Sequence, residues 1–184
     1  MLRSEINELI REGDAFFRQY GFTLPPFAYW SPDDFRARKA EAGLIVEQGL
    51  GWDVTDYGDG HYDTLGLFLF TVRNGNAGDL GNPKGGRVYA EKLLISGDHQ
   101  ISPMHRHIVK TEDIINRGGG TLVLELHAAT PEGGIDRHGP VTVMCDGIDR
   151  TLPPGGHLKL DPGESVTLFP STWHAFWGEG GKVL

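Results

Sequence analysis

Residues His105–Gly120 read HRHIVKTEDIINRGGG, and the rest of the chain can be interpreted outward from this stretch. His105 and His107 are separated by one residue, so in an extended backbone both side chains lie on the same face. Glu112 follows five residues after the second histidine. Two imidazoles and a carboxylate that converge on one point form a site for a divalent transition metal. A fourth ligand is expected from a distant strand, and His174 in FPSTWHAFW is the candidate.

Short apolar segments bounded by turn residues lie on both sides of this stretch. We expect strands over residues 66–76, 87–96, 121–128 and 141–147, the first of them ending in an Asn-Gly turn. Residues 156–160 and 165–169 are expected to form a hairpin around the turn at 161–164. The absence of helices between these strands predicts an all-β sandwich or barrel. The final residues, Val183 and Leu184, resemble the opening of a further strand.

The N-terminal part of the chain has a different pattern. A helical apolar stripe predicts a helix over Ser4–Tyr20, and the sequence Ser31-Pro32-Asp33-Asp34 predicts the start of a second helix that runs to Glu41. The segment Leu24–Trp30 is expected to lie across the domain as an apolar arm. We therefore expect residues 1–60 to form helices and an arm packed on a barrel of residues 61–184, within one structural domain.

Length and composition exclude several classes of protein. A chain of 184 residues is long enough for one domain with a core. Its 27 glycines and 11 prolines suit frequent tight turns. The net charge of −8 disfavours binding to nucleic acid or to an anionic membrane surface. A single cysteine, Cys145, and no apolar run of membrane-spanning length predict a cytoplasmic protein.

The ligand spacing resembles the cupin family. Gly97, His105, His107, Glu112 and Gly118 are similar to the first cupin motif, although seven residues separate the first two of them where five are usual. The second motif is matched by Gly163, Phe169, Ser171 and His174, with phenylalanine and serine where the family has proline and glycine. The resemblance implies a double-stranded β-helix, which is a jelly-roll barrel, with His105, His107, Glu112 and His174 as metal ligands.

Nearly the whole chain resembles one group of cupins, the bacterial D-lyxose isomerases. The resemblance rests on LPPFAYWSP, LGWDVTDYG, PMHRHIVKTEDIINRGGG and the stretch around His174. It implies a manganese-dependent, homodimeric isomerase that interconverts D-lyxose with D-xylulose and D-mannose with D-fructose. It also implies active-site roles for Lys110 and Lys92. Members of this family continue for some tens of residues with acidic groups, so we expect this chain to be an incomplete version of a longer enzyme.

The same chemistry follows from the ligands themselves. Moving a carbonyl from C1 to C2 of a sugar requires removal of a proton from the carbon beside it. A divalent metal chelated by two sugar oxygens would polarise the carbonyl and stabilise the enediolate. Three histidines and one glutamate suit manganese but also zinc, iron, cobalt or nickel, so the ligand set alone leaves the metal open.

The other candidate residues have a structural alternative. Lys92 is predicted to share a strand face with apolar residues, which favours a pocket, but on an edge strand its amine would reach solvent. Lys110 could likewise point to solvent. Phe176 and Trp177 could wall a sugar pocket or pack in the core. His127 and Glu125 alternate on one strand and could be rival ligands or could orient the ligands.

A last group of histidines is expected at the surface in turns: His61, His99, His138 and His157. Three other functions remain open for the predicted site. An iron dioxygenase could use the same four ligands, a sugar-binding cupin could use them without turnover, and a phosphosugar isomerase would need a cluster of cations near the site. The segments near the site offer only Arg106, Lys110 and Arg117 for such a cluster.

Overall fold

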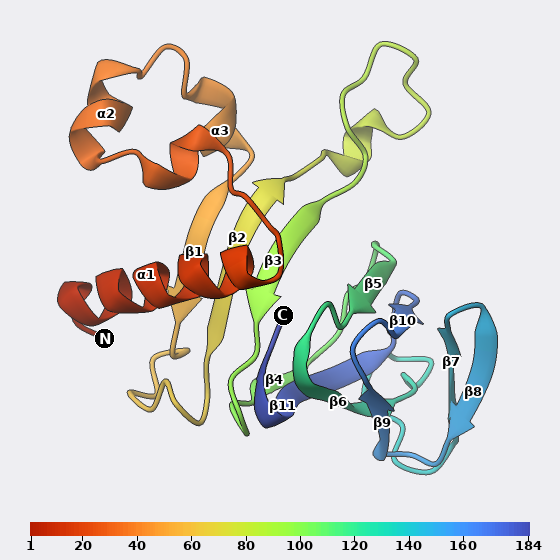
Figure 1. The fold of residues 1–184 in the computed structure, drawn as a ribbon. Helices are drawn as coiled ribbons and strands as arrows, with labels where there is room; N and C mark the ends of the chain where they lie inside the picture. Colours follow the sequence, from red (N-terminus) through yellow and green to blue (C-terminus); the bar gives the residue numbers. More distant parts are fainter. The chain divides into compact units, whose positions relative to one another are not determined.

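The N-terminal helix forms as its apolar stripe predicted. The structure is a computed structural model and describes residues 1–184. Helix α1 (Arg3–Gln19) buries Phe17 completely, with its ring 6.2 Å from that of Trp52 and 6.1 Å from that of Phe68. Gly13 faces the Phe68 ring, where any side chain would collide with it. The missing side chain therefore lets the helix lie close against the strands that follow (Figure 1).

Three strands form the sheet that α1 covers. They are β1 (Gly51–Thr55), β2 (Leu67–Arg73) and β3 (Glu91–Ile95), in the order β1-β2-β3. Short helices precede them: η1 (Pro26–Tyr29), α2 (Pro32–Ala37) and α3 (Gly43–Glu47). The start of α2 was predicted correctly, because Ser31 and Asp34 form a capping box there. The helix is shorter than predicted, ending at Ala37.

The Asn-Gly turn expected after β2 is not a tight hairpin. Asn74 instead donates from Nδ2 to the carbonyl of Gln48, 2.9 Å away. The chain then leaves the sheet, forms η2 (Ala77–Asp79) and returns, and the Asn76 amide donates to the carbonyl of Arg87 at the neck of this excursion. Because Arg87–Ala90 lie in this loop, β3 begins only at Glu91.

The chain divides into two compact units. The first comprises Met1–Thr55 and Phe68–Leu94, and the second comprises Asp56–Leu67 and Ile95–Leu184. This division differs from the predicted boundary at residue 60, because β2 and β3 pair with β1 and so belong with the N-terminal helices. The packing of residues 1–60 on the barrel stays a prediction.

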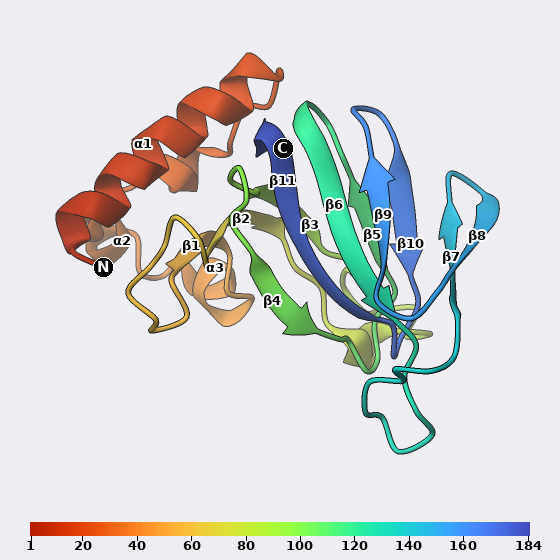
Figure 2. The same ribbon diagram turned by 90° about the horizontal axis from the view of Figure 1, so that it is seen from below.

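The second unit consists of two four-stranded sheets (Figure 2). One has the order β4-β11-β6-β9 and contains β4 (Ser102–His105), β6 (Gly119–His127), β9 (Gly156–Leu160) and β11 (Trp173–Val183). The other has the order β5-β10-β7-β8 and contains β5 (Glu112–Ile115), β7 (Val141–Cys145), β8 (Ile148–Leu152) and β10 (Ser165–Leu168). All of the pairings within these sheets are antiparallel.

Side-chain alternation defines the two faces of the first of these sheets. Leu124 of β6 pairs with Phe176 of β11 and with Leu158 of β9, and all three are buried. We call this the inner face, and it also carries Leu122, Leu126, Leu160 and His174. The alternating residues form the outer face, where Glu125 and Trp177 lie. The inner face supplies the core of the unit, together with buried residues of the second sheet such as Val143, Val166 and Leu168.

The hairpin predicted for residues 156–169 does not form. β9 pairs with β6 in one sheet, whereas β10 pairs with β5 and β7 in the other. The turn at 161–164 therefore carries the chain from one sheet to the other. Its sequence is compatible with either connection, and the distant partner strands determine which one forms. The predicted strand at Val183 is the end of β11 rather than a new strand.

Asn116 connects the segment after β5 to the first sheet. Its side chain is completely buried, and its Nδ2 donates to the carbonyls of Gly120 and Leu160, each 2.9 Å away. Its Oδ1 accepts from the amide of Gly118 at 2.9 Å. Every polar atom of this buried side chain is thus satisfied, which stabilises the glycine-rich turn that leads into β6.

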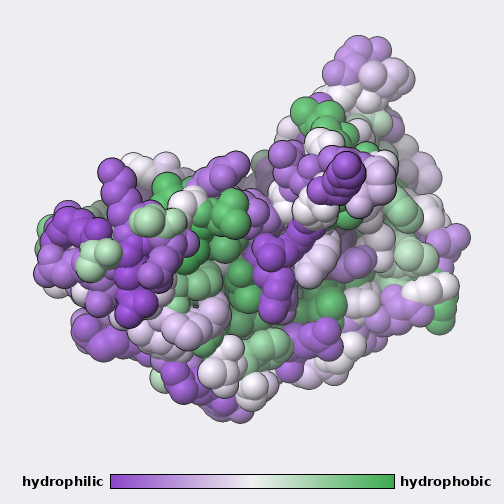
Figure 3. All heavy atoms as spheres, turned by 90° about the horizontal axis from the view of Figure 1, so that it is seen from above, coloured by the Kyte–Doolittle hydropathy of each residue, from purple (hydrophilic) through white to green (hydrophobic).

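Hydrophilic residues cover much of the face shown in Figure 3, in keeping with the net charge of −8. None of the helices has the length and apolar composition needed to cross a membrane.

Candidate metal centre

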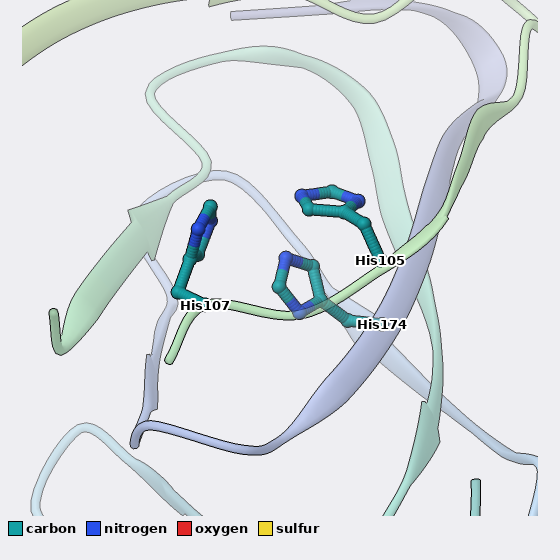
Figure 4. Close-up of side chains that lie close together, drawn as sticks. All are labelled: His105, His107 and His174. Carbon is teal, nitrogen blue, oxygen red and sulfur yellow. The ribbon is translucent and has the colours of Figure 1, made fainter. Parts of the chain in front are cut away.

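Three histidines that the sequence singled out lie together on the second unit. His105 is the last residue of β4 and pairs directly with His174 near the start of β11. His107 lies two residues beyond the end of β4. The three rings face one another (Figure 4), and one nitrogen from each lies within 4.8 Å of the others. The three rings therefore lie close together, with His107 just beyond the strand that carries His105, and their role as metal ligands stays a prediction.

Backbone carbonyls orient two of these rings. The Nδ1 of His105 lies 2.7 Å from the carbonyl oxygen of Pro103, and the Nδ1 of His174 lies 3.0 Å from that of Thr172. Since a carbonyl oxygen only accepts, each Nδ1 carries the proton and donates it. In the neutral ring the lone pair then resides on Nε2, which is the arrangement typical of metal-binding histidines.

Glu112 lies beside the histidines and comes from the other sheet. It is the first residue of β5, and its Oε2 is 3.0 Å from the Nε2 of His107 and 3.7 Å from that of His174. Its Oε1 accepts a hydrogen bond from the Nζ of Lys110 at 3.0 Å. The cluster of His105, His107, Glu112 and His174 thus joins the ends of both sheets.

Burial determines the protonation of this cluster. Desolvation lowers the pKa of His174 from 6.5 to about 4, against smaller opposing effects from the Thr172 carbonyl and Glu112. Desolvation also lowers the pKa of His107, and its effect exceeds that of the Glu112 charge, which raises the pKa. Burial raises the pKa of Glu112, but the hydrogen bond and charge of Lys110 and the nearby histidines outweigh it, so this pKa is lowered. Near neutral pH the cluster therefore offers neutral imidazoles at His107 and His174 and a carboxylate at Glu112.

One atom shows that this donor set fits a metal ion. The Nε2 of His174 is the single buried side-chain nitrogen or oxygen in the chain without a hydrogen-bond partner, and the residue is 1% exposed. A buried lone pair without a partner costs free energy unless a cation or donor satisfies it. Imidazole nitrogens and a carboxylate oxygen suit a divalent transition metal.

Comparison with known proteins places the whole chain in one family. A sequence model described as D-lyxose isomerase matches residues 1–184. The chain is 42% identical over 182 residues to a D-lyxose/D-mannose isomerase of Serratia proteamaculans, covering 98% of this chain and 78% of the relative. It is also 42% identical to a D-lyxose/D-mannose isomerase of Escherichia coli O157:H7, with the same coverage of both chains. This chain belongs to the D-lyxose isomerase family. The resemblance seen in the sequence is thereby confirmed, and the chain is an isomerase.

Solved structures of L-ribose isomerases share the fold. The enzyme of Acinetobacter sp. DL28 in complex with L-ribose aligns with a TM-score of 0.62 at 16% identity, over 100% of this chain and 78% of its own. The enzyme of Cellulomonas parahominis without ligand aligns with a TM-score of 0.58 at 14% identity, over 100% of this chain and 81% of its own. At such identities the likeness concerns the fold, and it confirms the all-β, jelly-roll architecture that was predicted.

The two lysines singled out in this D-lyxose isomerase family member lie in different units. Lys110 belongs to the second unit and is bonded to Glu112, with its side chain 46% exposed. Lys92 belongs to β3 of the first unit and is exposed, whereas the neighbouring Leu93 is buried. The strand pattern predicts Lys92 on an apolar face. In the structure the buried face of β3 carries Leu93 and Ile95, and Lys92 lies on the other face. A role for Lys92 at the site stays a prediction.

The two aromatic residues after His174 lie on opposite faces of β11. Phe176 shares the inner face with His174, is 8% exposed, and has its ring centre 6.4 Å from that of His105. Trp177 is on the outer face, with its ring 5.2 Å from that of His157. Strand alternation therefore places Trp177 on the face opposite the histidine cluster, and its expected contact with the sugar stays a prediction.

The rival pair of Glu125 and His127 is also on the outer face. Their side chains contact each other, with the Nε2 of His127 3.0 Å from the Oε1 of Glu125. His127 pairs across the sheet with Trp173, while its neighbour Leu126 pairs with His174. The pair consequently neither joins nor orients the three histidines.

Sequence reasoning missed the groups that surround the ligands. The carbonyls of Pro103 and Thr172 each lie two residues before a histidine, a local spacing that could have indicated their role. Arg106 stacks on Trp173, with Cζ 5.4 Å from the ring centre. No sequence signal connects these two residues, because only the pairing of β4 with β11 brings them together.

Proposed function

We propose that this chain is a metal-dependent aldose–ketose isomerase that interconverts D-lyxose with D-xylulose, and D-mannose with D-fructose, through an enediol(ate) of the sugar. Family membership supports the reaction class and the sugar, since both relatives named above are D-lyxose/D-mannose isomerases. The observation that supports metal dependence is the convergence of three histidines on a point where the buried Nε2 of His174 has no partner.

His105, His107, Glu112 and His174 would hold the metal, and manganese is the ion we propose. A divalent metal bound there would polarise the sugar carbonyl and favour negative charge on the adjacent oxygens. The chain orients three of these four residues in advance. Carbonyls fix the tautomers of His105 and His174, and Lys110 holds the carboxylate of Glu112.

Lys110 is the proposed catalytic residue. Its ammonium group has three donors, of which one is directed at the Oε1 of Glu112. The remaining donors are free to bond a sugar oxygen that gains negative charge as the proton leaves the neighbouring carbon. A hydrogen bond that strengthens as charge develops lowers the barrier more than it strengthens binding.

The substrate we propose is an unphosphorylated sugar. Phosphate recognition calls for clustered arginines or lysines. The guanidinium of Arg106 stacks on Trp173, which leaves Lys110 as a single cation beside the histidines and not a cluster. Phe176, on the inner face beside His105, is the proposed apolar contact for the sugar. We also propose that the enzyme acts as a homodimer in the cytoplasm. The resemblance to the family supports the dimer, and the single free Cys145 is compatible with a reducing compartment.

The direct test is an isomerase assay with metal exchange. Protein stripped with a chelator is reloaded separately with manganese, cobalt, nickel, zinc or iron, and D-xylulose formed from D-lyxose is measured. We expect activity to require a divalent metal, to be highest with manganese, and to extend to D-mannose. Full activity in the stripped protein would contradict metal dependence. Turnover of phosphorylated sugars alone would contradict the proposed substrate.

A further inference from the structure

The segment that carries His107 lacks the support of a strand. β4 ends at His105, and the next strand, β5, begins only at Glu112. Between them, Ile108 and Val109 are 71% and 79% exposed, so no apolar packing holds the segment. The His107 ring nevertheless lies close to the other two. Other contacts must therefore hold this half of the metal centre.

Arg106 supplies one such contact. It lies between two of the histidines in sequence, and its guanidinium stacks on the ring of Trp173 with Cζ 5.4 Å from the ring centre. Its Nη1 donates to the Oγ of Ser171 at 3.4 Å. Trp173 immediately precedes His174 in β11. The side chain between His105 and His107 is thus joined directly to the residue next to His174.

The guanidinium is packed on a second side by the loop that follows β6. Trp173 donates from Nε1 to the carbonyl of Gly133 at 3.3 Å. A side chain at Gly133 would lie 2.5 Å from the Nη2 of Arg106, so this glycine leaves the room that the guanidinium occupies. Arg106 forms no ion pair with a carboxylate; its hydrogen bond is with Ser171 and its ring contact is with Trp173.

A backbone hydrogen bond completes the connection. The amide of Ser171 donates to the carbonyl of His107 at 2.8 Å. Ser171 has a φ of 75°, a left-handed conformation that a serine rarely adopts. Such a conformation persists only where its surroundings hold it. The turn that contains Ser171 is closed by a hydrogen bond from the amide of Thr172 to the carbonyl of Phe169 at 3.1 Å, and the contacts of Ser171 with Arg106 and His107 add to it.

We propose that Arg106 is a positioning residue of the metal centre. Together with Trp173 and Ser171 it forms what we call the Arg106 clamp, which fixes His105 and His107 relative to His174 from outside the ligand cluster. The clamp matters for function only if the cluster binds a metal, so this inference rests on the proposed function. Residues that orient metal ligands typically change affinity by 10- to 100-fold when they are replaced.

The test compares Arg106→Lys and Trp173→Leu with the parent for manganese affinity, measured by competition with a chelator. Lysine keeps the positive charge and loses the planar stacking group, so any effect reflects geometry rather than charge. We expect each variant to bind manganese about tenfold more weakly. Trp173→Phe keeps a ring face and should restore most of the affinity. The matched control is Arg150→Lys, which alters an arginine of β8 paired with Glu164 and should leave affinity within about twofold of the parent.

Two further measurements separate positioning from general destabilisation. In metal-free protein, hydrogen exchange at the Ser171 amide should speed up in Arg106→Lys, by roughly fivefold or more, while amides of β6 keep their protection. The double variant Arg106→Lys/Trp173→Leu should bind manganese no more weakly than the weaker single variant, because both changes remove one contact.

The outcomes distinguish this inference from the proposed function. If the parent fails to bind one manganese ion per chain, the proposed metal-dependent function fails and the clamp has no role. If the parent binds manganese, but Arg106→Lys and Trp173→Leu bind it as tightly, the clamp alone is rejected. If both variants bind more weakly but Arg150→Lys does so equally, the effect is not specific, and the clamp is rejected as well.

Discussion

Lys110 and Glu112 form an ion pair whose carboxylate is shared with the histidine cluster. The Nζ of Lys110 lies 3.0 Å from one oxygen of Glu112, and the other oxygen lies 3.0 Å from the Nε2 of His107. The lysine is therefore held at the site by the same side chain that would bind the metal. Because it is 46% exposed, the pair itself adds little to stability. Removal of the lysine side chain is therefore expected to change the catalytic rate without a large change in the stability of the fold.

Replacing Lys110 with alanine should slow catalysis and leave the protein folded. We expect kcat for D-lyxose to fall by roughly 100-fold, the loss typical of one donor to developing charge. KM and manganese content should change much less. Steady-state kinetics and metal analysis check both expectations.

The matched control for this variant is Lys159→Ala. Lys159 pairs with Glu179 at 2.7 Å on the outer face of the first sheet of the second unit, away from the histidines. Its kcat should equal that of the parent. If Lys110→Ala isomerises D-lyxose at the parent rate, then Lys110 is only a solvent-exposed lysine.

Replacing His174 with glutamine should abolish stoichiometric metal binding. The change removes the partnerless Nε2 at the centre of the cluster. Manganese content after dialysis should fall from about one ion per chain to below about one tenth, given the contribution of each ligand to a site of this type. His127→Gln alters a buried histidine on the opposite face of the same sheet and should keep full metal content. Equal metal content in the two variants would refute the assigned ligand set.

Stability of the metal-free protein should fall as the solution is acidified. The pKa of His174 is about 4 in the folded state against 6.5 ordinarily, so between these values the unfolded chain binds a proton that the folded chain does not. This contribution is fully present above pH 6.5 and is lost as pH falls through about 4. At 1.36 kcal/mol per pKa unit it amounts to about 3 kcal/mol. Denaturant titrations from pH 7 to 4.5 should show a smaller loss for His174→Gln, and parallel curves would contradict the shift.

Replacing Asn116 with alanine should destabilise the second unit. The change leaves two carbonyls and one amide without their buried partner. We expect a loss of about 3 kcal/mol, or a fall in melting temperature of about 10 °C. Asn82→Ala, which removes a hydrogen bond in an exposed turn, should have almost no effect on melting. A melting temperature within a degree of the parent for Asn116→Ala would show that water replaces these bonds.

The ligand cluster was predictable because its geometry is encoded locally. Residues at spacing two in extended backbone share a face, and this pattern indicated that His105 and His107 lie close together, although β4 itself ends at His105. The match to two cupin motifs then supplied His174. Helix α1 was predictable for the same reason, since its apolar stripe lies within the segment.

Features that depend on distant partners were not predictable in this way. The local sequence suits a hairpin at 161–164. In the structure β9 pairs with β6, whereas β10 pairs with β5 and β7, so the chain crosses from one sheet to the other at this turn. The prediction of an apolar face for Lys92 relied on strand alternation from Val88 and Ala90. These two residues lie in a loop before β3, so the alternation does not extend to them. Trp177 was placed near the site because it is close to His174 in sequence, although strand alternation turns it to the other face.

The pairing of His105 with His174 joins residues 69 positions apart in the chain (174 − 105), and this separation has a kinetic consequence. Contacts between residues so distant in sequence form after local ones, because closing a long loop costs entropy before any contact compensates for it. An ion bound between β4 and β11 would then stabilise the native protein more than the transition state for folding. Manganese should accordingly lengthen the lifetime of the folded chain by slowing its unfolding, while leaving the refolding rate close to that of the metal-free protein.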